Sequence, residues 1–479
     1  MTQPDTGAQK ASASPSKAAG EADDTLYAVR QKVYPRAVSG MFATWRWTLV
    51  WVTQVIFYGL CWLPWNGRQA VLLHLVDRKF YIFDWVFWPQ DVFFLAILLI
   101  ISAYSLFFFT AVAGRLWCGY ACPQTVYTEI FTWIEEKIEG NRAQRMKLDQ
   151  GPMTGRKFAL KAAKFGAWAA LALWTGFTFV GYFTPIRELV REAANFSFGP
   201  WELFWILFYG GFTYLFAGVM REQVCKYMCP YARFQGVMFD PDTLVITYDP
   251  ERGEPRGARK KGVDPRTVSK GDCVDCGICV QVCPTGIDIR NGMQYECIGC
   301  AACIDACDQV MEKMDYPKGL IRYTTENAMK RHWGRKEIIG HVMRPRIMIY
   351  AGVLMAICAA FVWGLATRST LRVDVIKDRS TLSREVEGGL IANVYNLHVM
   401  NMTEGPRRFA LSASGLDGVR ITPMEPFEVD AAGLKSVTVE VAVPPESGKP
   451  GSNTIYIEVK ALDDESVRVR EKTSFLMPR

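Results

Sequence analysis

The sequence predicts a multi-pass α-helical membrane protein of five transmembrane helices, with a small cysteine-rich domain and a C-terminal immunoglobulin-like β-sandwich. Three observations predict this fold class. Five apolar segments without a charged residue match the thickness of a bilayer core. Eight of the fourteen cysteines lie between residues 273 and 307. The last part of the chain alternates apolar and polar side chains in short runs, which is typical of strands in a sandwich.

The predicted transmembrane helices give the chain an orientation. Lys and Arg number nine in residues 114–164, against three in residues 64–91 and two in residues 184–202. Because short cytoplasmic loops are enriched in Lys and Arg, we expect the N-terminus and the cysteine-rich domain in the cytoplasm and the C-terminal domain in the periplasm. Tryptophans typical of an interfacial belt are Trp62, Trp65, Trp85, Trp88 and Trp201. The five segments are Trp47–Leu63, Val92–Ala113, Phe165–Phe183, Leu203–Met220 and Ile347–Ala366.

Composition divides the chain into five parts. The first is rich in Ala, Ser, Gly and Pro and is expected to be a disordered cytoplasmic tail. Strands of the last part are expected at Ile391–Met402, Ser436–Val443 and Thr454–Val459. The parts are the tail (1–40), a four-helix membrane domain (41–235), the cytoplasmic cysteine-rich domain (236–340), the fifth transmembrane helix (341–368) and the periplasmic sandwich (369–479).

The eight clustered cysteines repeat one spacing, Cys-x2-Cys-x2-Cys-x3-Cys, with Pro284 after the first run and Asp308 after the second. This is the ligand spacing of bacterial two-cluster ferredoxins, in which the fourth cysteine of each run ligates the other cluster. Zinc sites use paired knuckles set apart, and disulfides would leave neighbouring cysteines too close to pair. We therefore expect a ferredoxin-like domain with two [4Fe–4S] clusters, one on Cys273, Cys276, Cys279 and Cys307, the other on Cys297, Cys300, Cys303 and Cys283.

A second group of thiols follows the second and fourth apolar segments. Cys118 and Cys122, like Cys225 and Cys229, stand in the pattern Cys-x-Tyr-x-Cys-Pro, which predicts an internal duplication of a two-helix unit. Cysteines at i and i+4 share one helix face, so the two pairs together would offer four thiolates suited to Cu(I) or to redox cycling. The alternative is that these cysteines are small packing residues. The lone Cys61 and Cys358 are expected to serve packing alone.

Several function classes are excluded or disfavoured. The four histidines, His74, His332, His341 and His398, lie outside the apolar segments, which excludes a bis-histidine haem in the membrane. No G-x-G-x-x-G follows a strand, so a nicotinamide or flavin fold is not expected. The net charge of +7 fits basic residues at the membrane edge and does not imply a nucleic-acid partner.

One strand of the C-terminal part carries three side chains that copper favours. His398, Met400 and Met402 alternate along one face, where they could contact copper from the periplasm. The favoured interpretation is that this face is exposed to solvent, while Tyr395, Leu397 and Val399 point inward.

Longer motifs run through most of the chain and carry a family resemblance. They are Tyr34-Pro35-Arg36, FWPQD at Phe87–Asp91, WCGYACPQTVYTEIF at Trp117–Phe131, REQVCKYMCPYARFQ at Arg221–Gln235, the eight-cysteine run and YPKGLIRYTTEN at Tyr316–Asn327. With these motifs the chain resembles the CcoG/FixG/RdxA family, accessory proteins for assembly of the cbb(3)-type cytochrome c oxidase.

The resemblance implies a protein of the bacterial inner membrane with an immunoglobulin-like periplasmic domain. It also implies an oxidoreductase acting on a metal ion, which reduces Cu(II) to Cu(I) for the oxidase. Carried over by position, the copper or redox thiols would be Cys118, Cys122, Cys225 and Cys229. The implied partners are the oxidase or its copper-delivery proteins, and no motif specifies the electron donor.

Two other functions fit the same motifs. A quinol-oxidising electron-transfer subunit would be similar to the polyferredoxin membrane proteins of nitrate and nitrous oxide respiration, which also combine Cys-x3-Cys-Pro helices with two clusters. The β-domain and the YPKGLIRY stretch favour the copper-linked family over this reading. A redox-sensing scaffold for oxidase assembly would use the clusters as sensors instead of carriers.

Overall fold

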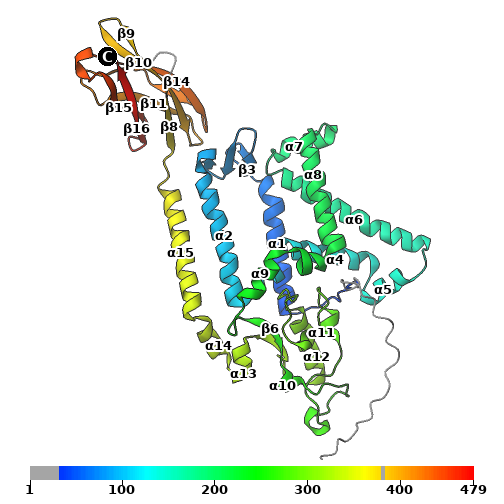
Figure 1. Cartoon of the computed structure of the whole chain (residues 1–479). Coiled ribbons are helices and arrows are strands. Elements are labelled where there is room, and N and C mark those ends of the chain that lie inside the picture. The colour runs from blue at the N-terminus through cyan, green and yellow to red at the C-terminus, as the bar shows by residue number, and fades with distance from the viewer. Residues whose placement is uncertain (1–31, 379–382, 479) are drawn as a thin grey trace, which may run out of the picture. The chain divides into compact units, whose positions relative to one another are not determined.

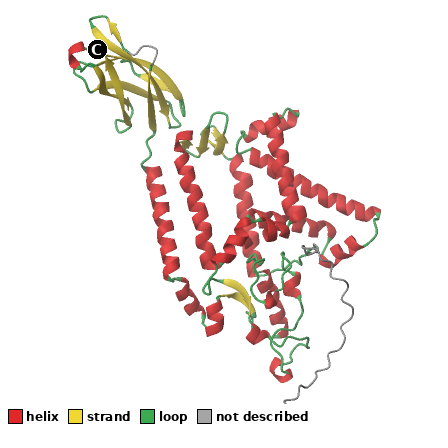
Figure 2. Ribbon diagram, in the orientation of Figure 1, coloured by secondary structure: helices red, strands yellow, loops and turns green. Residues whose placement is uncertain are grey.

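The computed structural model describes residues 32–378 and 383–478, and shows a helical part followed by a C-terminal part made of strands (Figures 1 and 2). Residues 1–31 of the predicted tail (1–40) lie outside the described residues. Its last residues are held in place. The Arg36 N–H donates to the Gln281 carbonyl at 2.8 Å, and Arg145 Nη2 donates to the Pro35 carbonyl at 2.6 Å. Residues 34–40 therefore do not belong to a disordered tail.

Three helical segments in the described part are long and apolar enough to cross a membrane, where the sequence predicted five. They are Pro89–Ala113, Pro200–Met220 and Pro345–Ala366. The first consists mainly of α2 (Val92–Ala113), the second joins α8 (Pro200–Thr213) to a π-helix (Tyr214–Met220), and the third is α15 (Pro345–Ala366).

The other two predicted segments form helices that are less apolar. α1 (Met41–Gly59) begins before the first predicted segment and includes the buried Arg46. α6 (Gly155–Val180) begins before the third and carries Lys161 and Lys164 in its first turns. Trp, Thr and Gly in both helices lower their mean hydropathy, which a count of charged residues alone does not register.

The remaining helices are short and mostly have a recognisable start. Asn141, Thr154 and Thr325 accept a backbone N–H at the start of α5, α6 and α13, and proline is the first residue of α4 and α9. These elements are α3 (Leu116–Tyr120), α4 (Pro123–Glu139), α5 (Arg142–Gln150), α7 (Ile186–Asn195), a second π-helix (Val224–Met228), α9 (Pro230–Met238), α10 (Pro250–Gly253), α11 (Ile278–Gln281), α12 (Ala302–Met314), α13 (Glu326–Arg331) and α14 (Arg335–Val342).

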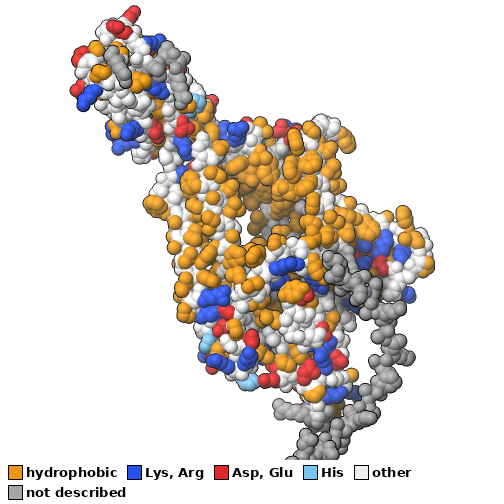
Figure 3. Space-filling view, in the orientation of Figure 1, with side chains coloured by type: hydrophobic (Ala, Val, Ile, Leu, Met, Phe, Trp, Pro, Cys, Tyr) orange, Lys and Arg blue, Asp and Glu red, His pale blue; other side chains and the backbone are white. Residues whose placement is uncertain are grey.

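The helices α2 and α15 pack against each other and leave most of their apolar surface uncovered. Their aromatic rings meet at Phe94–Phe361 and Tyr104–Tyr350, with centroids 6.0 and 6.2 Å apart. Only 6% of the apolar window of each helix is buried. Figure 3 shows hydrophobic side chains gathered over these helices. Because water does not favour apolar surface of this extent, the helices suit a lipid environment.

The C-terminal part is a β-sandwich of two antiparallel sheets, as predicted. One sheet has the order β12-β14-β10-β8 with β9 beside β10, and the other has the order β13-β11-β15-β16. Tyr395, Leu397 and Val399 are fully buried in the core between them. The strands are β8 (Leu371–Lys377), β9 (Arg384–Val386), β10 (Leu390–Asn401), β11 (Arg407–Ser414), β12 (Arg420–Thr422), β13 (Phe427–Val429), β14 (Leu434–Val443), β15 (Gly451–Ala461) and β16 (Arg468–Met477).

The connection between α1 and α2 folds into short strands and ends near Trp88, which packs against Met400 at the end of β10 and Met402 just after it. Trp88, Met400 and Met402 are 8%, 2% and 6% exposed and pack in one cluster, so the predicted solvent face of β10 is wrong at both methionines. Trp88 likewise does not belong to an exposed interfacial belt. Arg368 Nη2 lies 2.5 Å from Asp91 Oδ2 beside this cluster. The strands are β1 (Pro64–Trp65), β2 (Arg68–Gln69), β3 (Val71–His74), β4 (Lys79–Ile82) and β5 (Trp85–Phe87).

Candidate iron–sulfur and thiol site

The cysteine-rich part is built from two similar loops, each leading into a helix. Gly277 and Ala301 precede α11 and α12 and both have left-handed backbones, with φ of 64° and 57°. These turns bring the cysteines before each helix close to those inside it. The pairing of β6 (Val245–Tyr248) with β7 (Ile321–Thr324) closes the part on one side.

The first cavity of this part is lined by the four cysteines of the first predicted set. Cys273, Cys276, Cys279 and Cys307 surround about 370 Å³ together with apolar side chains such as Met311 and Leu320. Cys307 comes from the second run of the sequence. The predicted exchange of the fourth ligand between the runs is therefore matched by the position of Cys307.

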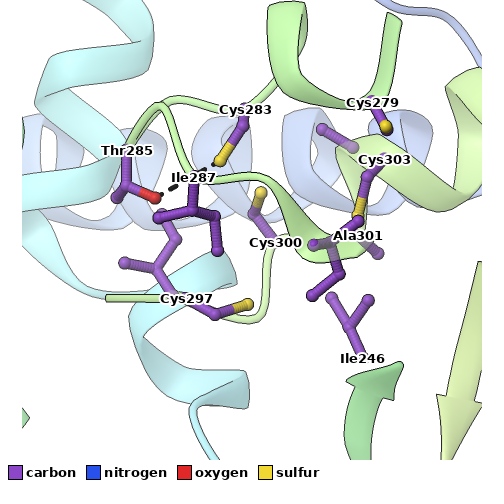
Figure 4. A pocket seen from close by; sticks show the side chains of 12 residues that line it. Ile246, Cys279, Cys283, Thr285, Ile287, Cys297, Cys300, Ala301 and Cys303 are labelled. Atoms are coloured by element: carbon purple, nitrogen blue, oxygen red, sulfur yellow. Dashed lines mark hydrogen bonds between the residues drawn. The ribbon is translucent and has the colours of Figure 1, made fainter. Parts of the chain in front are cut away.

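The second cavity brings together the second predicted set. Cys283, Cys297, Cys300 and Cys303 line about 340 Å³, with Cys279 at its edge (Figure 4). Cys283 Sγ lies 3.3 Å from Thr285 Oγ1. The remaining lining is apolar and includes Ile246, Ile287 and Ala301.

The chemistry of both cavities fits iron–sulfur clusters. Burial, and then the neighbouring Cys279 and Cys273, raises the pKa of Cys307 to about 12. Burial likewise raises the pKa of Cys300 to about 12, and Cys283 adds to the effect while Arg46 opposes it. Ligation must displace these protons. Among the described residues no three His, Cys, Asp or Glu side chains come together as a site for a single metal ion. Four spaced thiols around an apolar cavity suit a cluster better than one ion.

The two membrane-side thiol pairs do not share a helix face as predicted. Cys118 lies in α3 and Cys225 in the second π-helix, but each helix ends before its second cysteine. Cys122 and Cys229 have extended backbones, with φ, ψ of −61°, 126° and −77°, 110°. The reason is the proline that follows each of them, which disfavours a helical conformation in the residue before it.

Both thiol motifs follow the same backbone plan, which supports the expected duplication. In each, the residue directly after the preceding apolar helix has an unusual conformation: Gly114 (φ 57°, ψ −125°) in the first motif and Arg221 (φ 43°, ψ −112°) in the second. A residue with a side chain rarely adopts this conformation. Arg221 is held there by its ion pair with the buried Glu135, with Nη2 and Oε2 2.6 Å apart.

The four membrane-side thiols are neighbours. The thiol of Cys118 donates to Oε1 of the fully buried Gln235 at 3.3 Å. Burial raises the pKa of Cys118 to about 12, and Cys122 adds to this. Burial also raises the pKa of Cys225 to about 12, with further contributions from Cys122 and Cys229. They do not form a ready site for one metal ion in the part of the chain that the structure describes.

The second cysteine set packs directly against the membrane-side thiols. Cys118 and Cys225 contact the apolar cluster that contains Cys300 and Ile298. A Cβ added to Gly119 would lie 2.8 Å from the Cα and N of Cys300, so the two backbones are in close contact. The sequence interpretation did not identify this contact, although glycine between the two cysteines of the first motif is compatible with it.

Two buried polar side chains join α1 to the cysteine-rich part and were also missed from the sequence. Arg46 Nη1 donates to the Cys300 carbonyl at 2.7 Å, and Arg46 Nε lies 3.4 Å from Glu129 Oε2. Asp305 accepts the backbone N–H groups of Phe42 and Ala43 at the start of α1, at 3.2 and 2.7 Å. A charged residue near the start of an otherwise apolar helix was the available signal for Arg46.

Comparison with known proteins agrees with this geometry. Family profiles match residues 220–326 as a 4Fe–4S dicluster domain, 95–141 as a 4Fe–4S binding domain, and 361–478 as the Ig-like fold at the C-terminus of FixG. The nitrogen fixation protein FixG of Rhizobium meliloti is 38% identical over 422 residues, covering 82% of this chain and 80% of FixG. The chain belongs to the FixG/RdxA family.

Further relatives delimit what this FixG/RdxA chain shares with others. Protein RdxA of Cereibacter sphaeroides is 37% identical over 405 residues, covering 83% of this chain and 85% of RdxA. The ferredoxin-type protein NapH of Haemophilus influenzae is 26% identical over 206 residues, covering 39% of this chain and 66% of NapH. As a FixG/RdxA protein, the chain is a membrane-associated iron–sulfur electron-transfer protein.

Proposed function

We propose that this chain is a cupric reductase of the bacterial inner membrane, which supplies Cu(I) for assembly of a cbb(3)-type cytochrome c oxidase. The observation that carries the proposal is the packing of Cys118 and Cys225 against the loop that holds Cys300. It gives electrons a short route from the cysteine-rich part to a group of soft thiols. Thiolates favour Cu(I) over harder ions, so the same group suits the reduced product.

The proposed roles of the residues follow from their positions. Cys273, Cys276, Cys279 and Cys307 would hold one [4Fe–4S] cluster, and Cys283, Cys297, Cys300 and Cys303 the other. When bound, such clusters supply one electron at a time, which is the number that separates Cu(II) from Cu(I). Cys118, Cys122, Cys225 and Cys229 would take up the copper substrate. Gly119 lets the thiol motif approach Cys300, and apolar side chains make up most of the remaining lining of both cavities.

The proposed topology retains all five spans. α1 and α6 would join the three more apolar helices in the membrane, with residues 236–340 in the cytoplasm and residues 369–479 in the periplasm. The nine Lys and Arg of residues 114–164 support this orientation. Alkaline phosphatase, which is active only in the periplasm, should be active when it is fused after residue 369. It should be inactive when it is fused after residue 262. The reverse pattern would contradict the orientation.

A purified-protein assay tests the proposed reaction. Protein in detergent is reduced with dithionite, freed of excess reductant, and mixed with Cu(II) and a colorimetric Cu(I) chelator. We expect one Cu(I) for each electron stored, with matching reoxidation of the visible iron–sulfur absorbance. The variant with serine at Cys118, Cys122, Cys225 and Cys229 should keep its iron but lose the copper-dependent reoxidation.

A second candidate is a quinol-oxidising electron-transfer subunit. The observation that favours it is the match to the ferredoxin-type protein NapH, which covers 39% of this chain. The same assay separates the two functions when a soluble quinone replaces Cu(II). Reoxidation by quinone together with no reaction with Cu(II) would establish the second candidate and overturn the first.

A further inference from the structure

One buried cation in the described part of the chain differs from all the others. Four of the five buried Lys and Arg side chains have a carboxylate within 4.0 Å, and the fifth, Arg115, forms no ion pair with any described carboxylate. The four pairs are Arg46 with Glu129 (3.4 Å), Arg145 with Glu135 (3.5 Å), Lys164 with Glu139 (2.9 Å) and Arg221 with Glu135 (2.6 Å).

Arg115 lies where the two thiol systems meet. Its side chain is 4% exposed, Nη2 donates to the carbonyl of Ala232, and Nε has no hydrogen-bond partner. Its own carbonyl accepts the N–H of Gly119 at 3.2 Å. A Cβ added to Gly299 would lie 3.1 Å from that same carbonyl oxygen. Arg115 thus touches the first thiol motif, the helix after the second motif and the loop that leads to Cys300.

A buried guanidinium without an anion is unfavourable, because its desolvation is not offset by a neighbouring charge. The contacts of Arg115 place it among the thiols of the proposed metal sites. Its Nη2 donates to the carbonyl of Ala232 on α9, and the Cys118 thiol donates to Gln235 on the same helix. Its carbonyl lies against Gly299, the residue before Cys300. The missing negative charge is therefore the thiolate charge that arrives when these sulfurs bind metal.

We propose that Arg115 is the counter-ion of the thiolates at the junction between Cys118, Cys225 and the Cys283, Cys297, Cys300 and Cys303 set. Its fixed positive charge raises the reduction potential of the cluster on that set, because an added electron makes the site more negative. The inference deepens the proposed function and rests on its assignment of a cluster to these four cysteines.

The first cysteine set lacks such an uncompensated charge. Arg290 lines its cavity, but Arg290 lies 2.7 Å from Asp288 and 2.5 Å from Asp275. The positive charge at the first set is thus balanced by carboxylates, whereas that of Arg115 is not. This difference places the more easily reduced cluster beside the membrane-side thiols.

A redox titration of the full-length protein, followed by electron paramagnetic resonance, tests the inference. The variants are Arg115→Met, which removes the charge, and Arg115→Lys, which keeps it. The control is Arg331→Met, which removes one charge from an exposed position on α13. We expect Arg115→Met to lower one of the two midpoint potentials by at least about 59 mV, which corresponds to a tenfold change in the equilibrium constant of a one-electron reduction. The other potential, and both potentials in Arg115→Lys and Arg331→Met, should stay close to the wild type.

Other outcomes of the titration decide against the inference. Unchanged potentials in Arg115→Met, equal shifts of both clusters, or the same shift in Arg115→Lys would overturn it. If Arg115→Met does not retain its iron, the iron content of Arg115→Lys decides. A full iron content in Arg115→Lys supports the role of Arg115 as counter-ion, and loss of iron from both variants overturns it. Failure of the wild type to reduce Cu(II) would refute the proposed function alone, since the two potentials are measured without copper.

Discussion

Gly119 lies so close to Cys300 that a methyl group in its place would be 2.8 Å from both the Cα and the N of Cys300. The contact joins α3, the short helix that follows a membrane-candidate helix, to the loop of a cysteine cavity. Nothing larger than hydrogen fits there without moving one backbone away from the other. The distance between the two thiol systems is therefore set at this position.

Replacing Gly119 by alanine should separate the two systems. Because the contact is between backbones, we expect a loss of stability of about 1–3 kcal/mol from overpacking, together with a lower yield of Cu(I) per stored electron. Thermal unfolding and the copper assay measure the two effects. Gly166→Ala is the matched control, since a Cβ at Gly166 in α6 meets nothing within 4 Å. Equal behaviour of the two variants would contradict the role of the contact.

Replacing Asp305 by alanine should loosen the start of α1. The carboxylate accepts two backbone N–H groups there, and loss of such a cap costs about 1 kcal/mol. Hydrogen–deuterium exchange should accelerate in residues 41–44, while Glu312→Ala, an exposed change on the same helix α12, should leave it unchanged. No difference between the variants would show that α1 does not need this cap.

Replacing Glu135 by glutamine should be strongly destabilising. Glu135 contacts Arg221, Arg145 and Lys164. The change leaves the buried Arg221 and Arg145 without their carboxylate, while Lys164 keeps Glu139, and we expect a loss of about 3–5 kcal/mol. The exposed pair of Lys330 with Glu326 supplies a control, Glu326→Gln, for which less than about 1 kcal/mol is expected. Chemical unfolding measures both variants, and similar losses would refute the buried network.

The same carboxylate predicts a pH dependence of stability. Burial alone would raise the pKa of Glu135, but Arg221, Lys164 and Arg145 hold it below its usual value. A carboxylate whose pKa is lower in the folded than in the unfolded protein stabilises the fold at pH values above its unfolded pKa, about 4.3. This stability is lost as the pH falls through the folded pKa. Wild-type stability should therefore fall more steeply on acidification below about pH 4.3 than that of Glu135→Gln. Parallel pH profiles would show that Glu135 does not contribute.

Copper binding should strengthen as the pH rises. Burial raises the pKa of Cys118 and of Cys225 to about 12, so both are protonated at neutral pH and must release protons to bind as thiolates. The affinity for Cu(I) should rise about tenfold per pH unit for each proton released. Competition with a Cu(I) chelator at several pH values measures this affinity. The variant with serine at Cys118, Cys122, Cys225 and Cys229 is the control. An affinity independent of pH would exclude these thiolates as ligands.

Local patterns in the sequence were sufficient for the cysteine sets and for the sandwich. Ligand spacing is fixed by how a short loop folds around a cluster, so the spacing alone predicts both sets, including Cys283 and Cys307. Strand alternation has a period of two, which placed Tyr395, Leu397 and Val399 inward. The prolines after Cys122 and Cys229 also indicate that each helix ends before these residues, which the i, i+4 spacing of the cysteines does not.

Contacts between distant segments could not be predicted in the same way. Met402 alternates like a solvent-facing residue, but it is buried in a cluster with Trp88 and Ala432, which come from distant parts of the chain. Arg115 and Arg46 resemble ordinary basic residues near membrane helices. Their roles depend on contacts with the loop at Gly299 and Cys300, which is far from both residues in the sequence. The count of five spans relied on the absence of charge, which does not detect the lower apolarity of α1 and α6.

The cap on α1 has a consequence for the biogenesis of the chain. Asp305 reaches the N–H of Ala43 across 262 residues of sequence. A ribosome makes α1 early and Asp305 late, so the first helix stays uncapped through most of synthesis. Contacts of such long range form slowly, because closing a long loop of chain costs conformational entropy. The first helix is therefore completed only after the cysteine-rich segment has folded, and defects in iron–sulfur maturation should become visible at the opposite end of the polypeptide.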